Sequence, residues 1–396
     1  MALAITTKIE ATCHCKSHSF TSIVPTSSLP LQASLCHCTS CRRCTGNLHT
    51  TGTPWPSLPE DHSLERYEFS PNVFIFFCGK CSQKMFWYVP KTGAYEVFTA
   101  CLPHDKGLLQ YNNHIFVGDT IDGGNSAWLL NPHPETGAHN MPVPRWAGFS
   151  DKSDKLDADW PANVGLKDEH ELTHGDELPI RCHCGGVNLR LARPDYRNVD
   201  KDKVPWFVDP ISRRKWLAIN CLCNSCRTTF SVDIVPLSFV EMKSIHSTSP
   251  GSSNFPNNVN DLSEAVAKGD SAVGTLTRYQ SSAGVIRYHC KRCSASVFYT
   301  NTNNSSRQEM LDLAVGLVDS PDGARAEGMF WWQFTNNANG DNCSLFEDVK
   351  DGWRAEVAKS FRSERKRWRE RKGWSVDEQT VEESQRESEE NGDMLI

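Results

Sequence analysis

Three cysteines spaced Cys-x-Cys-x-x-Cys are the feature of this sequence that most directly predicts chemistry. Thiols at this spacing can close on one metal ion, because each thiolate is a metal ligand. The pattern occurs twice, at Cys36, Cys38 and Cys41 and again at Cys221, Cys223 and Cys226. Each triplet has a Cys-x-Cys pair before it and a Cys-x-x-Cys pair after it, namely Cys13 and Cys15 with Cys78 and Cys81, and Cys182 and Cys184 with Cys290 and Cys293. The sequence therefore predicts two domains, each with seven metal-ligating thiols.

The number of thiols separates two kinds of metal site. A structural zinc site takes four ligands and is closed, whereas a reactive zinc site keeps one position for substrate. In each copy the two flanking pairs supply four thiols and the triplet supplies three, so the triplet is the candidate for the open site. The spacing leaves other pairings open, because triplet and flanking thiols could share one ion. Each triplet could also be structural, completed by a neighbouring side chain or by water.

Composition places these sites in a soluble globular chain. The chain of 396 residues has 17 cysteines, a hydrophobic content of 38% and a formal net charge of -6. No stretch approaches the length of a membrane span, and the first residues lack the charged and apolar segments of a signal peptide. Clustered cysteines in a reducing compartment are metal ligands more often than disulfides. We expect a cytoplasmic protein, with the nucleus as the alternative, that binds no membrane and has no general attraction for nucleic acid.

Matched segments predict two tandem, mainly β domains. We expect the first domain at residues 8–145, a linker at 146–176, the second domain at 177–350, a C-terminal amphipathic helix at 351–374 and an acidic disordered tail at 375–396. Short runs rich in Val, Ile, Phe and Tyr predict strands, among them residues 116–122, which we match to residues 314–319. The polar insertion at residues 244–260 predicts a disordered surface loop.

Aromatic and aliphatic residues at helical spacing predict the C-terminal helix. Trp353, Val357, Phe361 and Trp368 are four, four and seven residues apart, which places them on one face. We expect this face to pack on the second domain, with Asp351 as the N-cap. The basic end of the helix, residues 362–372, is expected to be a solvated surface.

Four motifs follow one another in the first copy: Cys-x-Cys, Cys-His-Cys-x-x-Cys-Arg-Arg, Phe-Cys-x-x-Cys and Val-Gly-Asp-Thr-Ile-Asp. This pattern resembles the glutathione-dependent formaldehyde-activating enzyme family, whose domain is shared with centromere protein V, and the resemblance covers nearly all of both copies. It implies a fold of several coiled β-sheets. It also implies one structural and one reactive zinc ion per domain, that is, two per domain and four in all.

The resemblance assigns a role to each thiol. It implies that the structural zinc ligands are Cys13, Cys15, Cys78 and Cys81 in the first copy and Cys182, Cys184, Cys290 and Cys293 in the second. The reactive, catalytic sets are then Cys36, Cys38 and Cys41, and Cys221, Cys223 and Cys226. The implied activity is that of a carbon-sulfur lyase resembling S-(hydroxymethyl)glutathione synthase, with a small thiol such as glutathione and an aldehyde as partners. The alternative is a non-catalytic zinc-binding interaction module of the centromere protein V type.

The two copies depart from the family pattern at different places. The glycine after the first Cys-x-Cys pair is present as Gly185 in the second copy, but Lys16 replaces it in the first. The glycine beyond the triplet is Gly46 in the first copy and Ser231 in the second. We expect the first copy to be the reactive one, because Arg42 and Arg43 would attract an anionic thiol and Gly46 would let the backbone approach the ligand.

Overall fold

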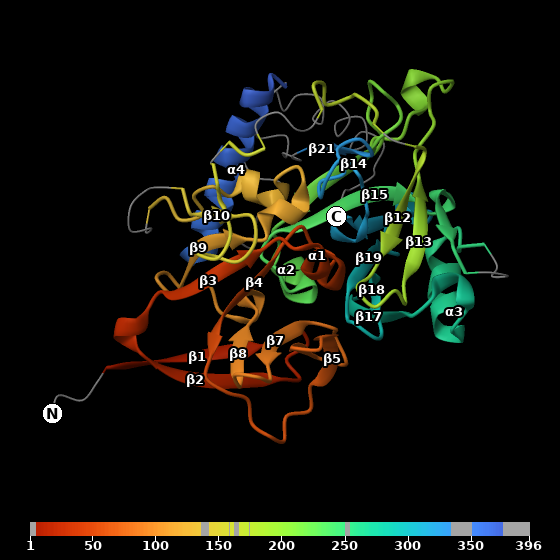
Figure 1. Cartoon of the computed structure of the whole chain (residues 1–396). Coiled ribbons are helices and arrows are strands. Elements are labelled where there is room, and N and C mark those ends of the chain that lie inside the picture. Colours follow the sequence, from red (N-terminus) through yellow and green to blue (C-terminus); the bar gives the residue numbers. More distant parts are fainter. Residues whose placement is uncertain are drawn as a thin grey trace.

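The computed structural model of the chain describes residues 5–135, 142–157, 159–161, 166–173, 175–249, 254–333 and 351–374. The fold is mainly β, as predicted, with four α-helices in this described part (Figure 1). We call residues 5–161 the first half and residues 175–333 the second half. The acidic tail predicted for residues 375–396 lies outside the described residues.

The first half contains a two-stranded hairpin and a nine-stranded sheet. In the hairpin, β1 (Thr6–Thr12) pairs with β2 (Ser19–Pro25), and alternate residues of β1 such as Ile9 and Ala11 are buried. The sheet has the order β11-β10-β9-β3-β4-β8-β7-β6-β5. Its strands are β3 (Leu31–Cys36), β4 (Thr50–Trp55), β5 (Glu65–Ser70), β6 (Val73–Phe77), β7 (Lys84–Val89), β8 (Ala94–Val97), β9 (Leu109–Ile115), β10 (Arg145–Trp146) and β11 (Lys155–Leu156).

The second half contains a three-stranded and a seven-stranded sheet. The smaller sheet has the order β12-β13-β16, formed by β12 (Glu177–Arg181), β13 (Asn188–Ala192) and β16 (Ile245–Ser247). The larger sheet has the order β17-β18-β19-β20-β15-β14-β21. Its strands are β14 (Trp216–Cys221), β15 (Val235–Glu241), β17 (Leu276–Ser282), β18 (Val285–Cys290), β19 (Ser296–Asn301), β20 (Met310–Ala314) and β21 (Phe330–Trp332).

Strand pairing follows the same plan in both halves. The strand that ends at the first cysteine of a triplet, β3 or β14, lies between an antiparallel neighbour, β4 or β15, and a parallel neighbour, β9 or β21. Phe86 pairs with Val97 of β8 as Phe298 pairs with Leu313 of β20. β8 and β20 are therefore counterparts, and so are the residues that follow them.

This register shows that our match between residues 116–122 and 314–319 was wrong. The first segment follows β9, whose counterpart is β21, whereas the second follows β20. Neither segment is a strand, because the chain forms the 3-10 turns η3 (Val117–Thr120) and η9 (Val315–Leu317) there. Phe116 and Ile121 have φ angles of 55° and 65°, which a strand does not allow. A shared Val-Gly dipeptide does not determine which strands a segment joins.

The loop predicted to be disordered at residues 244–260 is partly ordered. β16 pairs with β13 and buries Ile245 against the core. Further on, α3 (Val259–Lys268) begins at Asn258, whose side chain accepts hydrogen bonds from the Asn260 and Asp261 N–H groups. Residues 250–253 lie outside the described part of the chain. Three buried apolar side chains, Ile245, Phe255 and Val259, together with the Asn258 cap, order a segment whose overall composition is polar.

The boundary predicted between residues 145 and 146 falls inside a strand. β10 pairs with β9 on one side and with β11 on the other, so the start of the predicted linker belongs to the sheet of the first half. Arg145 is buried and donates to Ser126 Oγ at 2.8 Å and to the carbonyls of Asp157 and Trp160 at 3.0 and 2.9 Å. These bonds tie residues 145–160 to the first half.

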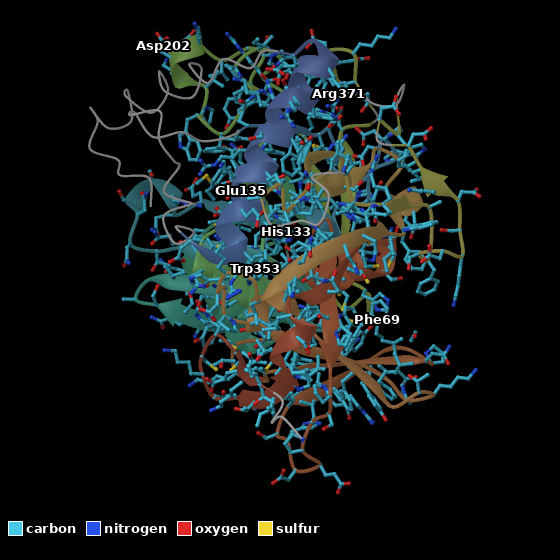
Figure 2. All side chains as sticks on the ribbon, turned by 90° about the vertical axis from the view of Figure 1, so that its left-hand side faces the viewer. Phe69, His133, Glu135, Asp202, Trp353 and Arg371 are labelled. Carbon is cyan, nitrogen blue, oxygen red and sulfur yellow. The ribbon has the colours of Figure 1, made fainter. Side chains whose placement is uncertain are left out.

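Helix α4 (Gly352–Lys372) forms where the aromatic spacing predicts it and buries Trp353, Val357, Phe361 and Trp368. It does not pack on the second half alone, because Trp128 of the first-half turn η4 (Gly124–Trp128) contacts the rings of Phe361 and Trp368. Figure 2 shows α4 running along one face of the molecule from Trp353 toward Arg371. Its basic end is not simply solvated, because Arg365 is fully buried with its guanidinium 4.8 Å from the Trp128 ring centre.

The two halves meet through α1 (Thr39–Thr45) and α2 (Asn224–Phe230), which lie next to each other in Figure 1. The Asn47 side chain donates to the Phe230 carbonyl at 2.9 Å. Gly46 ends α1 with a φ of 83°, and a Cβ added there would lie 2.3 Å from the Ser296 carbonyl oxygen. The absence of a side chain at Gly46 therefore allows the two halves to pack together. We had expected a different role for this glycine, namely to let the backbone come close to a bound ligand.

Candidate metal centres

Two groups of four cysteines come together, one in each half. In the first half, the turn between β1 and β2 meets the turn between β6 and β7, bringing together Cys13, Cys15, Cys78 and Cys81. In the second half, the turns after β12 and β18 bring together Cys182, Cys184, Cys290 and Cys293. Recorded sulfur–sulfur distances are 3.7 and 3.6 Å in the first group and 3.6 and 3.5 Å in the second. Tetrahedral thiolate sites with metal–sulfur bonds of about 2.3 Å need sulfur atoms about 3.8 Å apart, so both groups fit one metal ion.

The turns that carry these thiols need left-handed backbone, and both halves supply it. Lys16 has a φ of 58° and Gly185 has a φ of 70°, so the lysine adopts the conformation of the glycine that the family pattern contains. Ser82 and Ser294, each directly after a ligand cysteine, have φ angles of 62° and 60°. Their hydroxyls lie 2.8 Å apart and join the two four-cysteine turns across the halves. The substitution at Lys16 therefore leaves the shape of the turn unchanged.

Each triplet forms a separate three-cysteine group, which resolves the pairing that the spacing left open. Cys36 ends β3, and Cys38 is the N-cap of α1, where its sulfur accepts a hydrogen bond from the Cys41 N–H at 3.2 Å. The second triplet is built in the same way at the end of β14 and the start of α2, from Cys221, Cys223 and Cys226. The three sulfur atoms of each group lie within 4.8 Å of one another. Each triplet could therefore hold a metal ion with three protein ligands.

The electrostatics of the two triplets differ. In the first, hydrogen bonds from the Cys36 and Cys41 side chains lower the pKa of Cys38 to about 3. In the second, hydrogen bonds from the other two thiols lower the pKa of Cys226 far below its usual value, and the Arg287 guanidinium lowers it further. In each triplet, hydrogen bonds from the neighbouring thiols favour a thiolate, and in the second triplet a guanidinium adds to this effect.

Arg42 and Arg43 donate to oxygen atoms rather than to the triplet thiols. The buried Arg42 donates from Nε to the His37 carbonyl at 3.3 Å and from Nη2 to the Asp119 carbonyl at 3.3 Å. Arg43 forms an ion pair with Asp319 of the second half at 2.6 Å. Arg42 contributes to the low pKa of Cys38 through its charge, but the hydrogen bonds from the neighbouring thiols contribute more. Arg42 and Arg43 therefore lie beside the first triplet with hydrogen bonds to oxygen atoms, and their attraction for an anionic thiol stays a prediction.

The cation that contacts a triplet thiol lies in the second half. Arg287 of β18 donates from Nη1 to Cys226 Sγ at 3.6 Å and from Nη2 to Ser225 Oγ at 2.8 Å. The hairpin of β5 and β6 in the first half is equivalent to that of β17 and β18. At the position of Arg287, this hairpin has the buried residue Ile75. Nothing in the local sequence of the second triplet signals this contact, because the arginine is more than sixty residues away in the chain.

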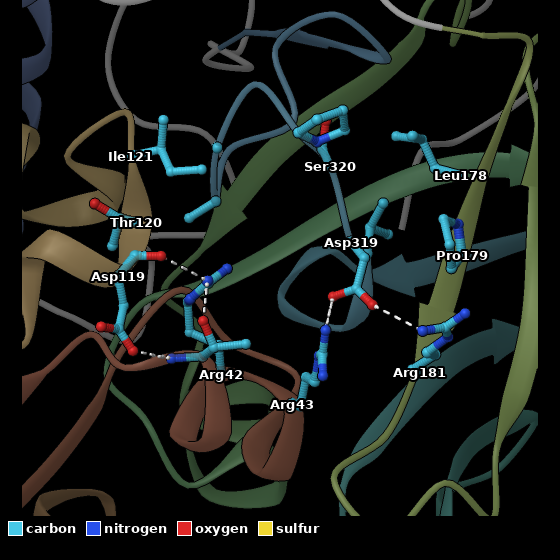
Figure 3. Close-up of a pocket in the computed structure, with 15 residues that line it drawn as sticks. Arg42, Arg43, Asp119, Thr120, Ile121, Leu178, Pro179, Arg181, Asp319 and Ser320 are labelled. Atoms are coloured by element: carbon cyan, nitrogen blue, oxygen red, sulfur yellow. Dashed lines mark hydrogen bonds and ion pairs between the residues drawn. The ribbon is translucent and has the colours of Figure 1, made fainter.

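A pocket of about 460 Å³ lies beside the first triplet, between the two halves (Figure 3). Thr39, which follows Cys38, and the ion-paired Arg43 and Asp319 form part of its wall, and Arg181 lies 4.0 Å from Asp319. The lining residues are Thr39, Arg42, Arg43, Asp119, Thr120, Ile121, Leu178, Pro179, Arg181, Val318, Asp319, Ser320, Pro321, Gly323 and Ala324. Three guanidinium groups and two carboxylates give this lining an excess of positive charge.

Two buried histidines, His37 and His114, lie next to the first triplet in the interior of the first half. His37, between two triplet cysteines, is fully buried, and its Nε2 lies 2.9 Å from His114 Nδ1. His114 Nε2 lies 2.9 Å from the carbonyl of Leu129, the C-cap of η4, so the chain of contacts runs from the triplet through β9 to this turn. Burial lowers the pKa of His114 to about 3. No local signal in the sequence marks His114, because only the parallel pairing of β3 and β9 brings it to the triplet.

The histidines inside the Cys-x-Cys pairs link the halves reciprocally. His14 Nδ1 of the first half lies 2.8 Å from Thr228 Oγ1 of α2, and His183 Nδ1 of the second half lies 2.6 Å from the Tyr67 hydroxyl. Tyr279 packs edge-on against His14, as Tyr67 packs against His183. These histidines are therefore interface residues rather than ligands.

The remaining cysteines lie outside the four groups. Cys44 and Cys101 are buried, as expected for small apolar side chains, and Cys343 lies outside the described residues.

Among the described residues, no helix has the length and apolar character needed to cross a membrane. Comparison with protein-family models, with curated proteins and with solved structures finds no match to this chain.

Proposed function

We propose that this chain is a tandem pair of zinc-binding domains of the formaldehyde-activating type, and that it acts as a carbon-sulfur lyase-type enzyme on a thiol–aldehyde adduct. The observation that carries the proposal is the division of each seven-cysteine set into a group of four and a group of three. Four thiolates complete a tetrahedral zinc site, whereas three leave a position for a further ligand. Zinc bound at such a triplet supplies a position where an incoming thiolate is held and oriented.

The first half has the surroundings that suit this reaction. Thr39, which follows the triplet residue Cys38, lines the pocket, and the lining carries more guanidinium than carboxylate groups. An anionic thiol such as glutathione matches that charge. In the proposed reaction the thiol sulfur bonds to the aldehyde carbon as the C=O π bond breaks, and the thiol proton ends on the aldehyde oxygen, giving a hemithioacetal, which for formaldehyde is the S-hydroxymethyl thiol. The reverse reaction releases the aldehyde.

Matched substitutions in the two triplets test the proposal. Cys38→Ser removes one of the three thiols of the first triplet, so we expect it to abolish thiol-dependent formaldehyde turnover. Cys223→Ser is the control at the equivalent position of the second triplet, and we expect most turnover to remain. Elemental analysis under reducing conditions should find about four zinc ions per chain, one for each cysteine group. Two or fewer would refute the assignment of two sites per half, and loss of turnover only in Cys223→Ser would reverse the roles of the halves.

The second triplet favours a second candidate, the non-catalytic zinc-binding module. Cys221 is buried, and Arg287 already donates to the sulfur of Cys226. A thiolate that is neutralised by a fixed guanidinium suits a structural site better than one that binds an incoming thiol. Alkylation separates the candidates, because glutathione bound at a triplet should protect its cysteines. If glutathione protects neither triplet, the binding module replaces the enzyme.

A further inference from the structure

The shared strand pairing allows the surroundings of the two triplets to be compared residue by residue. The open pocket beside the first triplet is lined in part by Thr39, Arg42, Val318, Asp319 and Ser320. The pairing of β4 with β3 and of β15 with β14, together with the equivalence of β8 and β20, gives their counterparts beside the second triplet. These are Asn224, Arg227, Leu102, Pro103 and His104. The chain thus contains two equivalent regions, each formed by the triplet helix of one half and a turn of the other.

The first turn of α4 fills the region beside the second triplet. The buried Trp353 donates from its backbone N–H to the His104 carbonyl at 3.1 Å and from Nε1 to the Pro103 carbonyl at 3.0 Å. The contact is close, because a Cβ added at Gly352 would lie 1.6 Å from the His104 oxygen. His104 and Pro103 are the counterparts of pocket residues in the other region. Trp353 therefore lies where the first half has open space.

Arg354 extends this contact to the triplet itself. Its side chain is buried, and Nη2 donates to the carbonyl of Leu222 at 2.8 Å. Leu222 lies between the first two cysteines of the second triplet, at the position of His37 in the first. The His37 carbonyl accepts its hydrogen bond from Arg42 of its own helix. In the second half, Arg227 instead donates to the Leu102 carbonyl at 3.1 Å, and an arginine from α4 satisfies the triplet carbonyl.

Charge explains why α4 fits one region and not the other. Asp233 is buried in the second region, and its Oδ1 lies 3.4 Å from Arg354 Nε. Asp233 lies two residues beyond the C-cap of α2. The equivalent residue of the first half, two positions beyond the C-cap of α1, is the apolar Leu48. The open pocket instead carries Arg43 and Arg181, which would repel a further guanidinium. The second region therefore places one buried carboxylate between Arg354 and Arg227, which lies 3.8 Å from it, whereas the lining of the first region has more guanidinium than carboxylate groups.

We infer that the first turn of α4 is a built-in occupant of the second of two equivalent pockets, so that the pocket beside the first triplet is the accessible member of the pair. This inference does not depend on the proposed reaction. It rests on the carbonyls that Trp353 and Arg354 occupy and on the buried carboxylate of Asp233. α4 is then a plug that ties the C-terminal segment to the junction of the two halves and closes the region beside the second triplet to small molecules.

Site-resolved alkylation of the full chain tests the plug. A short pulse of iodoacetamide is followed by mass spectrometry of the peptides that contain each triplet. In the variant Trp353→Ala/Arg354→Ala, we expect alkylation of the second triplet to rise about tenfold, equivalent to about 1.4 kcal/mol, while that of the first triplet stays unchanged. Lys359→Ala is the matched control, because Lys359 lies on the same helix but is exposed and pairs with the exposed Glu135 at 2.7 Å.

The possible outcomes decide the question. An unchanged rate at the second triplet would overturn the inference. An equal rise at both triplets would also overturn it, because α4 would then support the whole fold rather than cover one site. Arg354→Met keeps the length of the side chain while removing its charge and its hydrogen bond. A rise confined to the second triplet in this milder variant supports the plug even if the double variant does not fold, and no change there contradicts it.

Discussion

The substitution Gly46→Ala measures how closely the two halves pack, and the structure allows its effect to be divided into two parts. Gly46 ends α1 with a φ of 83°, and an added Cβ would lie 2.3 Å from the backbone oxygen of Ser296 and 3.0 Å from Ala314 Cβ. The first part is the cost of a left-handed alanine, about 1–2 kcal/mol. The second is overpacking against a backbone atom that cannot rotate away, about 1–3 kcal/mol. We expect a total loss of about 2–5 kcal/mol in unfolding free energy.

Two other glycines separate these parts. Gly93 has a φ of 68° but nothing within 4 Å of its added Cβ, so Gly93→Ala should lose only the backbone part. Gly316 has no positive φ, but its Cβ would lie 2.1 Å from the Asn47 carbonyl oxygen, so Gly316→Ala should lose only the packing part. Both Gly316 and Gly46 belong to the junction of the halves, where the Gly316 N–H donates to the Gly46 carbonyl at 3.0 Å.

Urea unfolding of the three variants, at equal zinc and reductant concentrations, gives the comparison. The expected order of stability loss is Gly93→Ala smallest and Gly46→Ala largest. If Gly46→Ala loses no more stability than Gly93→Ala, the close contact between Gly46 and Ser296 has no energetic weight, and the reasoning fails. If Gly46→Ala instead keeps its stability but loses thiol-dependent turnover, the glycine serves the ligand, as the sequence first indicated.

Two further changes test the sites. Burial lowers the pKa of His49 from 6.5 to about 4. As the pH falls, the His49 imidazole is therefore protonated in the unfolded chain before it is protonated in the folded chain. The stability present above pH 6.5 is lost as the pH falls toward 4. His49 alone should account for about 3 kcal/mol of that loss, and His49→Gln should flatten the fall in urea stability between pH 6.5 and 4.5; an unchanged slope would contradict this. Cys78→Ser should release one metal ion and unfold the first half, because such sites contribute about 10–16 kcal/mol in zinc peptides. The control Cys44→Ser, at a buried cysteine outside the groups, should keep its metal; equal metal content and melting in both variants would refute the assignment.

Spacing in the sequence was sufficient to predict the features that depend on short segments. Each Cys-x-Cys or Cys-x-x-Cys pair follows from spacing, because it lies in one tight turn where the two thiols cannot be far apart. Which pairs share a group does not follow from spacing, because Cys13 and Cys15 meet Cys78 and Cys81 only in the folded chain. The face of α4 follows in the same way, because Trp353, Val357, Phe361 and Trp368 repeat at the helical period. The strand content follows from short runs of β-branched and aromatic residues, as in β6 and β7.

Only the tertiary structure decided what surrounds each site. Arg287, His114 and α4 reach the triplets from distant segments, and no local period relates them to the cysteines they approach. The directions of Arg42 and Arg43 were likewise set by Asp119 and Asp319, one of which belongs to the other half. Strand pairing also corrected our match of residues 116–122 with residues 314–319, because the Val-Gly dipeptide that both segments contain can follow either of two strands. Contacts between the halves depend on how two sheets pack, and composition and spacing within one segment do not contain that information.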